Sequence, residues 1–166
     1  MAIKFDFNRL RTAVDSFYKA KDTVGEEVVH LPALKSVKKV IALGDANATI
    51  IDDDSNSLYA STAAATADRT YTLPAAAKGL CFEFLATVAS DAQACIFEVP
   101  SGALLGGVLA QNGTGTTIVQ SDGTDTKLTV NDNVEPGTHL QFRCVDDTNW
   151  VVSGVVLSAD VDPAFS

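Results

Sequence analysis

The chain has 166 residues, of which 46% are apolar and 20% are charged, and its formal net charge is −9. This composition is typical of a folded domain with an appended segment, and it excludes extensive disorder. Residues 1–39 hold eight basic and five acidic residues, whereas residues 40–166 hold four basic and sixteen acidic ones. An acidic body repels nucleic acid and anionic lipid, and no apolar run approaches the length of a membrane span. We therefore expect neither nucleic acid nor a membrane as a partner.

The N-terminal residues are predicted to form an α-helical arm. Asn8 fits the position of an N-cap, and Gly25 is suited to stop a helix. Apolar residues between them recur at helical spacing, which predicts a helix over about 9–22. The residues that share this spacing are Leu10, Val14 and Phe17.

Phe5 and Phe7 precede this helix and alternate with charged residues. Aromatic side chains at a chain terminus suggest docking on another protein, although they could equally pack under the chain's own main domain. In the docking interpretation the arm supplies a basic and apolar contact surface. Its candidate residues are Lys4, Phe5, Phe7, Arg9, Leu10, Arg11, Val14 and Phe17.

The composition changes at about residue 44. The arm and a linker are therefore assigned to 1–43, an antiparallel β-domain to 44–157 and a C-terminal tail to 158–166. Within the first range, residues 26–43 are interpreted as a linker or as short strands that lead into the β-domain. Short alternating segments separated by Gly, Asp, Asn, Pro and Ser favour a β-sandwich, a jelly-roll-like fold or a barrel. The predicted strands are 48–51, 57–61, 70–73, 80–88, 94–99, 104–110, 116–120, 126–130, 139–145 and 150–157.

Two features refine this prediction. The sequence Asp122-Gly123 supplies the positive φ values of a tight turn, so strands 116–120 and 126–130 are predicted to form a hairpin. Alternation in strands 80–88 and 139–145 places one set of apolar side chains toward a single core. The expected core aromatic residues are Phe82, Phe84, Phe97, Phe142 and Trp150.

The three cysteines are odd in number and widely spaced, and they lie in apolar alternating runs. Buried thiols in a chain made in a reducing compartment are the favoured interpretation, and a single disulfide is the alternative. The cysteines are Cys81, Cys95 and Cys144.

No motif indicates catalysis or a cofactor. Asp52, Asp54 and Asn56 resemble the start of a calcium loop, but Ser57 stands where glycine is required and Ala63 where the bidentate glutamate is required. The glycine-rich segments lack the features of a phosphate-binding loop, and the two histidines have no metal-binding or nucleophilic neighbours at a recognised spacing. We expect no metal, no cofactor and no enzyme.

Two motifs carry a family resemblance. The first is Leu73-Pro74-Ala75-Ala76-Ala77-Lys78-Gly79-Leu80 followed by Phe82-Glu83-Phe84, and the second is Asp147-Thr148-Asn149-Trp150-Val151-Val152-Ser153-Gly154. Over residues 68–156 the chain resembles a β-domain of structural proteins in tailed bacteriophages, which occurs in head-decoration, head-fibre and tail-fibre components. The chain departs from the family pattern because no glycine separates Asp147 from Thr148, and because it lacks a long fibrous extension. We expect Trp150 to fill the end of the core, with its N–H directed to the polar turn that precedes it.

The resemblance implies a virion protein made in the bacterial cytoplasm. A short chain with a docking arm suits a decoration (cement) protein that binds the major capsid protein and stabilises the capsid, and the family suggests a homotrimer. One alternative is a host-recognition or carbohydrate-binding module that uses Trp150, Tyr59 or Tyr71 against a glycan. Another is a tail or connector subunit.

Overall fold

The structure is a computed structural model that describes residues 38–90, 92–112, 115–130, 134–158 and 163–166. The chain divides into two compact units, residues 1–37 and residues 38–166. The predicted helix over about 9–22 lies outside the described residues. The described part of the second unit is mainly β, as the alternating segments predicted.

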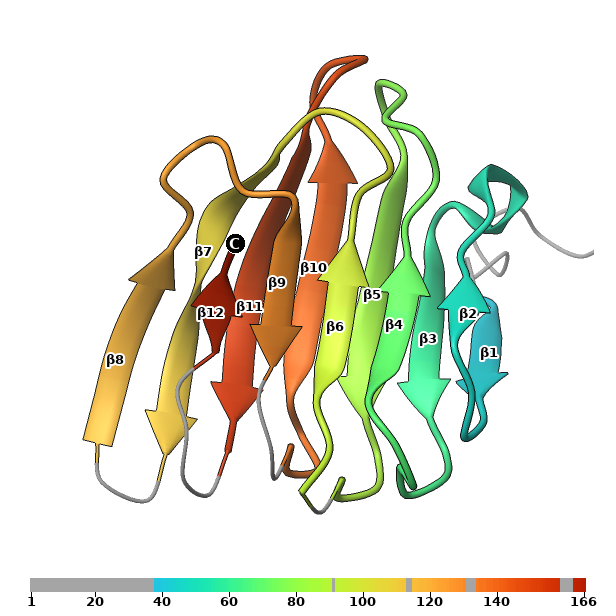
Figure 1. The fold of residues 1–166 in the computed structure, drawn as a ribbon. Coiled ribbons are helices and arrows are strands. Elements are labelled where there is room, and N and C mark those ends of the chain that lie inside the picture. Colours follow the sequence, from blue (N-terminus) through green and yellow to red (C-terminus); the bar gives the residue numbers. More distant parts are fainter. Residues whose placement is uncertain (1–37, 91, 113–114, 131–133, 159–162) are drawn as a thin grey trace, which may run out of the picture. The chain divides into compact units, whose positions relative to one another are not determined.

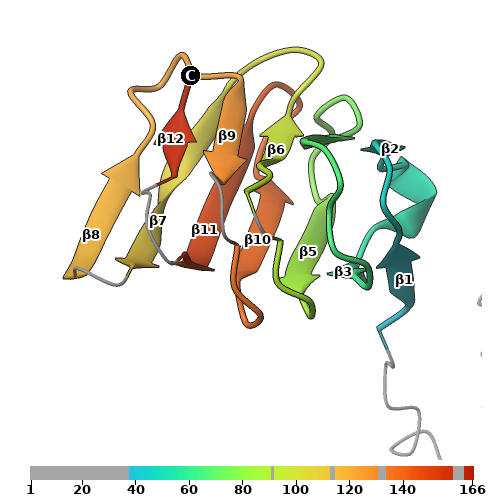
Figure 2. The ribbon, with the colours of Figure 1, turned by 60° about the horizontal axis from the view of Figure 1, so that its bottom comes forward.

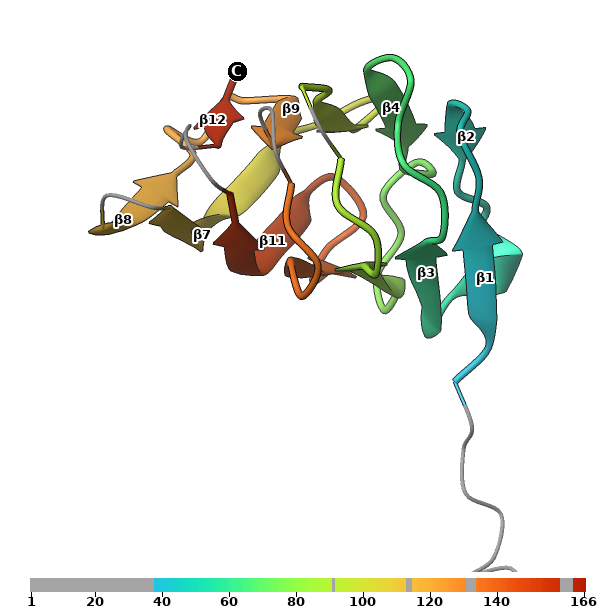
Figure 3. The same ribbon diagram turned by 90° about the horizontal axis from the view of Figure 1, so that it is seen from below.

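The second unit consists of two sheets that face each other (Figures 1 and 3). The seven-stranded sheet has the order β1 (Val40–Leu43), β3 (Ser57–Ser61), β5 (Cys81–Ala86), β10 (His139–Cys144), β11 (Trp150–Leu157), β7 (Leu104–Asn112) and β8 (Gly115–Gln120). The five-stranded sheet has the order β12 (Ala164–Phe165), β9 (Lys127–Val130), β6 (Cys95–Glu98), β4 (Arg69–Thr72) and β2 (Ala48–Thr49). A single 3₁₀ turn, Asp52–Asp54, is present among the described residues.

The chain alternates between the two sheets over its first six strands. As a result β1, β3 and β5 are parallel neighbours in one sheet, and β2, β4 and β6 are parallel neighbours in the other. The direction then reverses, because β10 is antiparallel to β5 and β9 is antiparallel to β6. The prediction of an antiparallel domain was wrong: the sheets are mixed, since each passage through the opposite sheet returns the chain in its original direction.

The predicted hairpin around Asp122-Gly123 was also wrong. The turn forms, with the Thr124 N–H donating to Asp122 Oδ1 at 2.8 Å. However, β8 belongs to the seven-stranded sheet and β9 to the five-stranded one, so the turn carries the chain between sheets. The partner of β8 is β7, with which it forms an antiparallel pair.

Two strands lie outside the range predicted for the β-domain. The strand β1 lies in the segment interpreted as a linker or short strands, and β12 lies in the predicted tail. The compact unit accordingly starts at Lys38 rather than at 44. Predicted strands 57–61 and 150–157 have the same bounds as β3 and β11, and the other boundaries differ by a few residues.

The core lies between the two sheets, whose layering Figure 2 shows from a second angle. It contains many aromatic rings. Phe97 on the five-stranded sheet lies 4.9 Å from Phe84 and 5.0 Å from Phe142 between ring centroids. Phe82 lies 5.6 Å from Trp150 between ring centroids. These five residues are all 2% exposed or less, so burial of their large aromatic area stabilises the fold.

Among the residues that the structure describes, no helix is long and apolar enough to span a bilayer.

Candidate functional site

The two motifs that carry the resemblance meet in the structure. Trp150 opens β11 and is fully buried, and its Nε1 donates a hydrogen bond of 3.1 Å to the carbonyl oxygen of Pro74. The sequence had predicted that the indole N–H would reach the polar turn before it. That prediction was wrong, because the ring points into the core and finds the carbonyl of a segment 76 positions away.

Further hydrogen bonds join the same two segments. Asp147 lies in the turn before Trp150, and its Oδ1 accepts a hydrogen bond of 2.8 Å from the Lys78 N–H. The Gly79 N–H donates to the carbonyl of Cys144 at 3.0 Å, and the Cys144 N–H donates to the carbonyl of Leu80 at 2.9 Å. The segments 73–80 and 144–150 therefore form one hydrogen-bonded junction at one end of the seven-stranded sheet.

A third segment, residues 102–103, contacts the junction. Asn149 Oδ1 accepts the N–H of Ala103 at 3.1 Å, and the Trp150 N–H donates to the carbonyl of Ala103 at 3.0 Å. The adjacent Gly102 has a φ of +75°, and a Cβ atom there would lie 1.7 Å from the carbonyl oxygen of Thr148. Glycine is therefore required at 102 by both its backbone conformation and the close approach of the turn.

Asp146 organises the turn itself. Its Oδ1 accepts the backbone N–H groups of Thr148 at 2.8 Å and Asn149 at 2.7 Å, together with the Thr148 hydroxyl at 2.8 Å. These hydrogen bonds, led by that from the Thr148 N–H, lower the pKa of Asp146 to about 2. The carboxylate is thus a structural acceptor that stays ionised, which explains why acidic residues precede the tryptophan.

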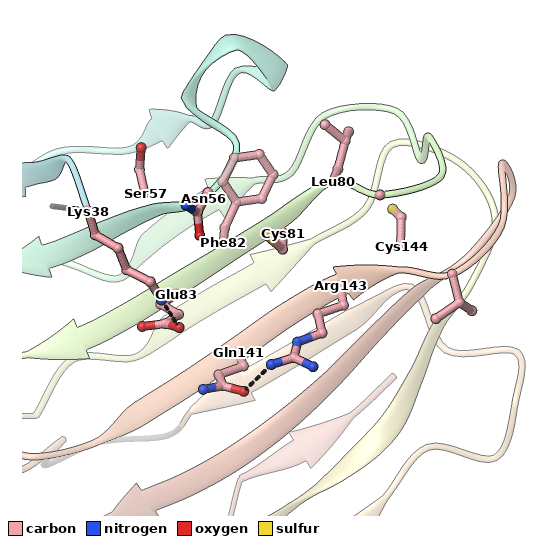
Figure 4. Close-up of a pocket in the computed structure, with 12 residues that line it drawn as sticks. Lys38, Asn56, Ser57, Leu80, Cys81, Phe82, Glu83, Gln141, Arg143 and Cys144 are labelled. Carbon is pink, nitrogen blue, oxygen red and sulfur yellow. Dashed lines mark hydrogen bonds and ion pairs between the residues drawn. The ribbon is translucent and has the colours of Figure 1, made fainter. Parts of the chain in front are cut away.

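A shallow groove of about 350 Å³ lies beside the junction on the outer face of the seven-stranded sheet (Figure 4). Lys38 pairs with Glu83 across it, and His139 Nε2 lies 3.5 Å from the same carboxylate. The hydrogen bond and the charge of Lys38 hold the pKa of Glu83 below its ordinary value, against the effect of partial burial. Arg143 Nη2 donates to Gln141 Oε1 at 3.1 Å.

The groove is lined by both charged and apolar groups. It combines this ion pair and the exposed Arg143 guanidinium with apolar atoms of Leu80 and Val145, and the Val145 side chain is 63% exposed. Its acid, Glu83, is already paired with Lys38, so it is held in one charge state. Such a surface can bind a carboxylate or a polar side chain through Arg143.

The residues predicted for capsid docking lie outside the described residues. They are Lys4, Phe5, Phe7, Arg9, Leu10, Arg11, Val14 and Phe17.

The aromatic residues of the glycan-binding alternative are all buried. Trp150 and Tyr71 are fully buried and Tyr59 is 4% exposed, so none of them can stack on a sugar. The Tyr59 hydroxyl donates to Asp54 Oδ2 at 3.0 Å, a contact that holds the 3₁₀ turn of the acidic segment. That part of the alternative is therefore wrong.

A buried ion pair was missed from the sequence. Arg69 is 2% exposed, and its Nη2 and Nε lie 2.7 and 3.0 Å from Asp45 Oδ1. Its Nη1 donates to the carbonyl of Ala63 at 3.1 Å, and Asp45 also accepts the N–H and hydroxyl of Thr66. The signal was present, because Arg69 lies two residues before Tyr71 and so faces the same side of the strand.

The cysteines are free thiols, as expected, but the expectation that all three are buried was wrong for Cys81. Cys95 and Cys144 are buried and Cys81 is partly exposed, and burial raises the pKa of Cys95 to about 11. In the described part of the chain no group of three or more His, Cys, Asp or Glu side chains is placed to hold a metal ion.

A comparison of this chain with protein-family models, curated proteins and solved structures finds no match. Function therefore has to be inferred from the motifs and from the geometry.

Proposed function

We propose that this chain is a structural protein of a tailed-bacteriophage virion, which binds the outside of the capsid as a decoration protein. The observation that carries the proposal is the contact between Trp150 Nε1 and the carbonyl of Pro74. The two motifs that resemble phage virion β-domains are far apart in sequence, yet they form one junction. Their co-occurrence thus has a structural reason, which favours a common domain over a chance likeness of two short segments.

The charge distribution supports a division of labour between the two units. The basic residues of the chain are concentrated before residue 40, and the acidic residues after it. In the proposed function the arm supplies the contact with the major capsid protein through Phe5, Phe7 and their neighbours. The acidic β-domain faces solvent, where its charge keeps particles from associating.

The proposed mechanism is mechanical and not catalytic. A decoration protein stabilises a shell by bridging subunits, and its many copies act together because each bound copy adds a small contribution. Three copies of the chain would seat where capsid proteins meet. The protein would be made in the host cytoplasm and would reside on the capsid surface.

The docking role of the arm is tested by replacing Phe5 and Phe7 with serine. The matched control is Ile51→Ser, which removes an exposed apolar side chain of the β-domain. Binding is measured by sedimentation of undecorated capsids with each variant. We expect the double variant to lose at least nine-tenths of the bound protein and the control to bind as the parent does. Equal binding by the double variant would contradict docking through these residues.

A further inference from the structure

The strand β8 extends beyond the five-stranded sheet. It is the last strand of the seven-stranded sheet in the order, and it lies at the left edge in Figure 1. All six of its residues are exposed or only partly buried, whereas most strands of this domain bury alternate side chains. Its sequence, GTTIVQ, has high β-propensity and carries neither lysine nor proline to block pairing at the edge.

An apolar row leads across the outer face of the sheet to this edge. Val155 pairs in register with Leu109, and Leu109 with Ile118. Their exposed fractions rise toward the edge, from 36% to 39% and 68%. Beside the row Gly107 leaves a shallow depression on the sheet surface, which Gln120 and Ser153 also line.

This part of the sheet is uncharged. The strands β7, β8 and β11 contain no Asp, Glu, Lys or Arg. The remainder of the chain after residue 39 carries sixteen acidic and four basic residues. The opposite edge strand, β1, differs in this respect, because Lys38 and Lys39 precede it and pair with Glu83 and Asp54.

We infer that the β8 edge and the apolar row of Val155, Leu109 and Ile118 form the surface on which a second copy of this chain docks. Two copies carry the same acidic charge, so they repel each other except where their facing surfaces are neutral. The outer surface of β7, β8 and β11 meets this condition and also carries the exposed apolar row. A basic partner would instead be drawn to the acidic turns.

The chemistry of the surface also suits a like partner. Among the described residues no strand lies on the outer side of β8, so the backbone between Thr116 and Val119 can extend the sheet by strand addition. Ile118 and Leu109 would lose their exposed area in the same contact. The inference rests on the β-domain alone and uses neither the arm nor capsid binding.

The test compares the assembly mass of the full chain with that of two variants. Ile118→Glu places a charge in the row, and Val40→Glu places the same charge on the other edge strand at a site of similar exposure, 63% against 68%. Mass is measured by light scattering after size exclusion between about 1 and 100 µM, and circular dichroism checks that each variant is folded.

We expect the parent chain and Val40→Glu to form an assembly of two or more copies, and Ile118→Glu to be at least tenfold more dissociated. A monomeric parent chain at all concentrations would overturn the inference. It would be overturned equally if folded Ile118→Glu kept the mass of the parent. Leu109→Glu provides a second test in a strand inside the sheet, with the same expected loss. Neither outcome depends on capsid binding, so failure here leaves the proposed function open to its own test.

Discussion

The indole Nε1 of Trp150 donates a hydrogen bond of 3.1 Å to the carbonyl oxygen of Pro74, and this contact joins the segments 73–80 and 144–150. The tryptophan is fully buried against Phe82, with ring centroids 5.6 Å apart. The ring therefore combines a large buried area with a satisfied donor, a combination that no other residue type provides at this position.

Replacement of Trp150 by phenylalanine is expected to destabilise the fold without abolishing it. The variant keeps an aromatic ring beside Phe82 but leaves the Pro74 carbonyl without its donor and opens a small cavity. We expect the free energy of unfolding to fall by about 2 kcal/mol. Urea denaturation followed by circular dichroism measures it, and a change below about 0.5 kcal/mol would show that the contact is not important.

Alanine variants of two glycines distinguish the stability cost of backbone strain from that of steric overlap. Gly102 and Gly123 both have positive φ values, +75° and +98°, but only at Gly102 would a Cβ atom meet another group, the Thr148 carbonyl. We expect Gly123→Ala to cost about 1 kcal/mol from conformation alone. Gly102→Ala should cost more than about 3 kcal/mol, because it also displaces the turn before Trp150. Similar unfolding midpoints for the two variants would contradict the closeness of this approach.

The ion pair of Arg69 and Asp45 predicts that removal of either partner lowers the stability by a different amount. Arg69 is 3% exposed in its side chain, and Asp45 is 30% exposed. In Asp45→Ala the guanidinium stays buried without its carboxylate, whereas in Arg69→Met the carboxylate can be hydrated. We expect Arg69→Met to cost about 1 kcal/mol and Asp45→Ala to lower the urea midpoint further. The reverse order would contradict the burial of Arg69.

The turn at Asp146 predicts acid sensitivity. Its pKa is lowered to about 2 in the folded protein by hydrogen bonds that the unfolded chain lacks, where the value is about 3.9. Its stabilising contribution is therefore fully present above about pH 4 and is lost as the pH falls toward 2. Asp146→Asn should flatten the decline of the thermal midpoint over this range.

The exposed Asp53 provides the control for this measurement, since it lies in the 3₁₀ turn away from the junction. Asp53→Asn should leave the slope of midpoint against pH unchanged. An unchanged slope in Asp146→Asn would indicate that other carboxylates cause the acid unfolding.

Much of the strand content was predictable, because alternation of apolar and polar side chains reports burial on one face. Phe82 and Phe84 illustrate this, since both point into the core from β5. The direction of each strand and its pairing partner were not predictable, because side-chain alternation is the same in parallel and antiparallel strands. The strands β3 and β5 are parallel because the chain passes through β4, in the other sheet, between them.

The junction could be predicted only in part. The two motifs identified the segments. However, no local pattern specifies that the indole N–H of Trp150 donates its hydrogen bond to the carbonyl of Pro74 and not to the turn before it. Arg69 was missed because charged residues are rarely buried, and its partner Asp45 lies in a loop 24 positions away. The docking residues of the arm stay a prediction.

The most direct test of the central claim is the stoichiometry of binding to capsids. The purified chain is mixed with undecorated capsids of the phage that encodes it, the capsids are pelleted, and the bound copies are counted by gel densitometry. We expect saturation at a fixed multiple of the capsid's symmetry sites. Absence of cosedimentation with intact, accessible capsids would contradict a decoration role.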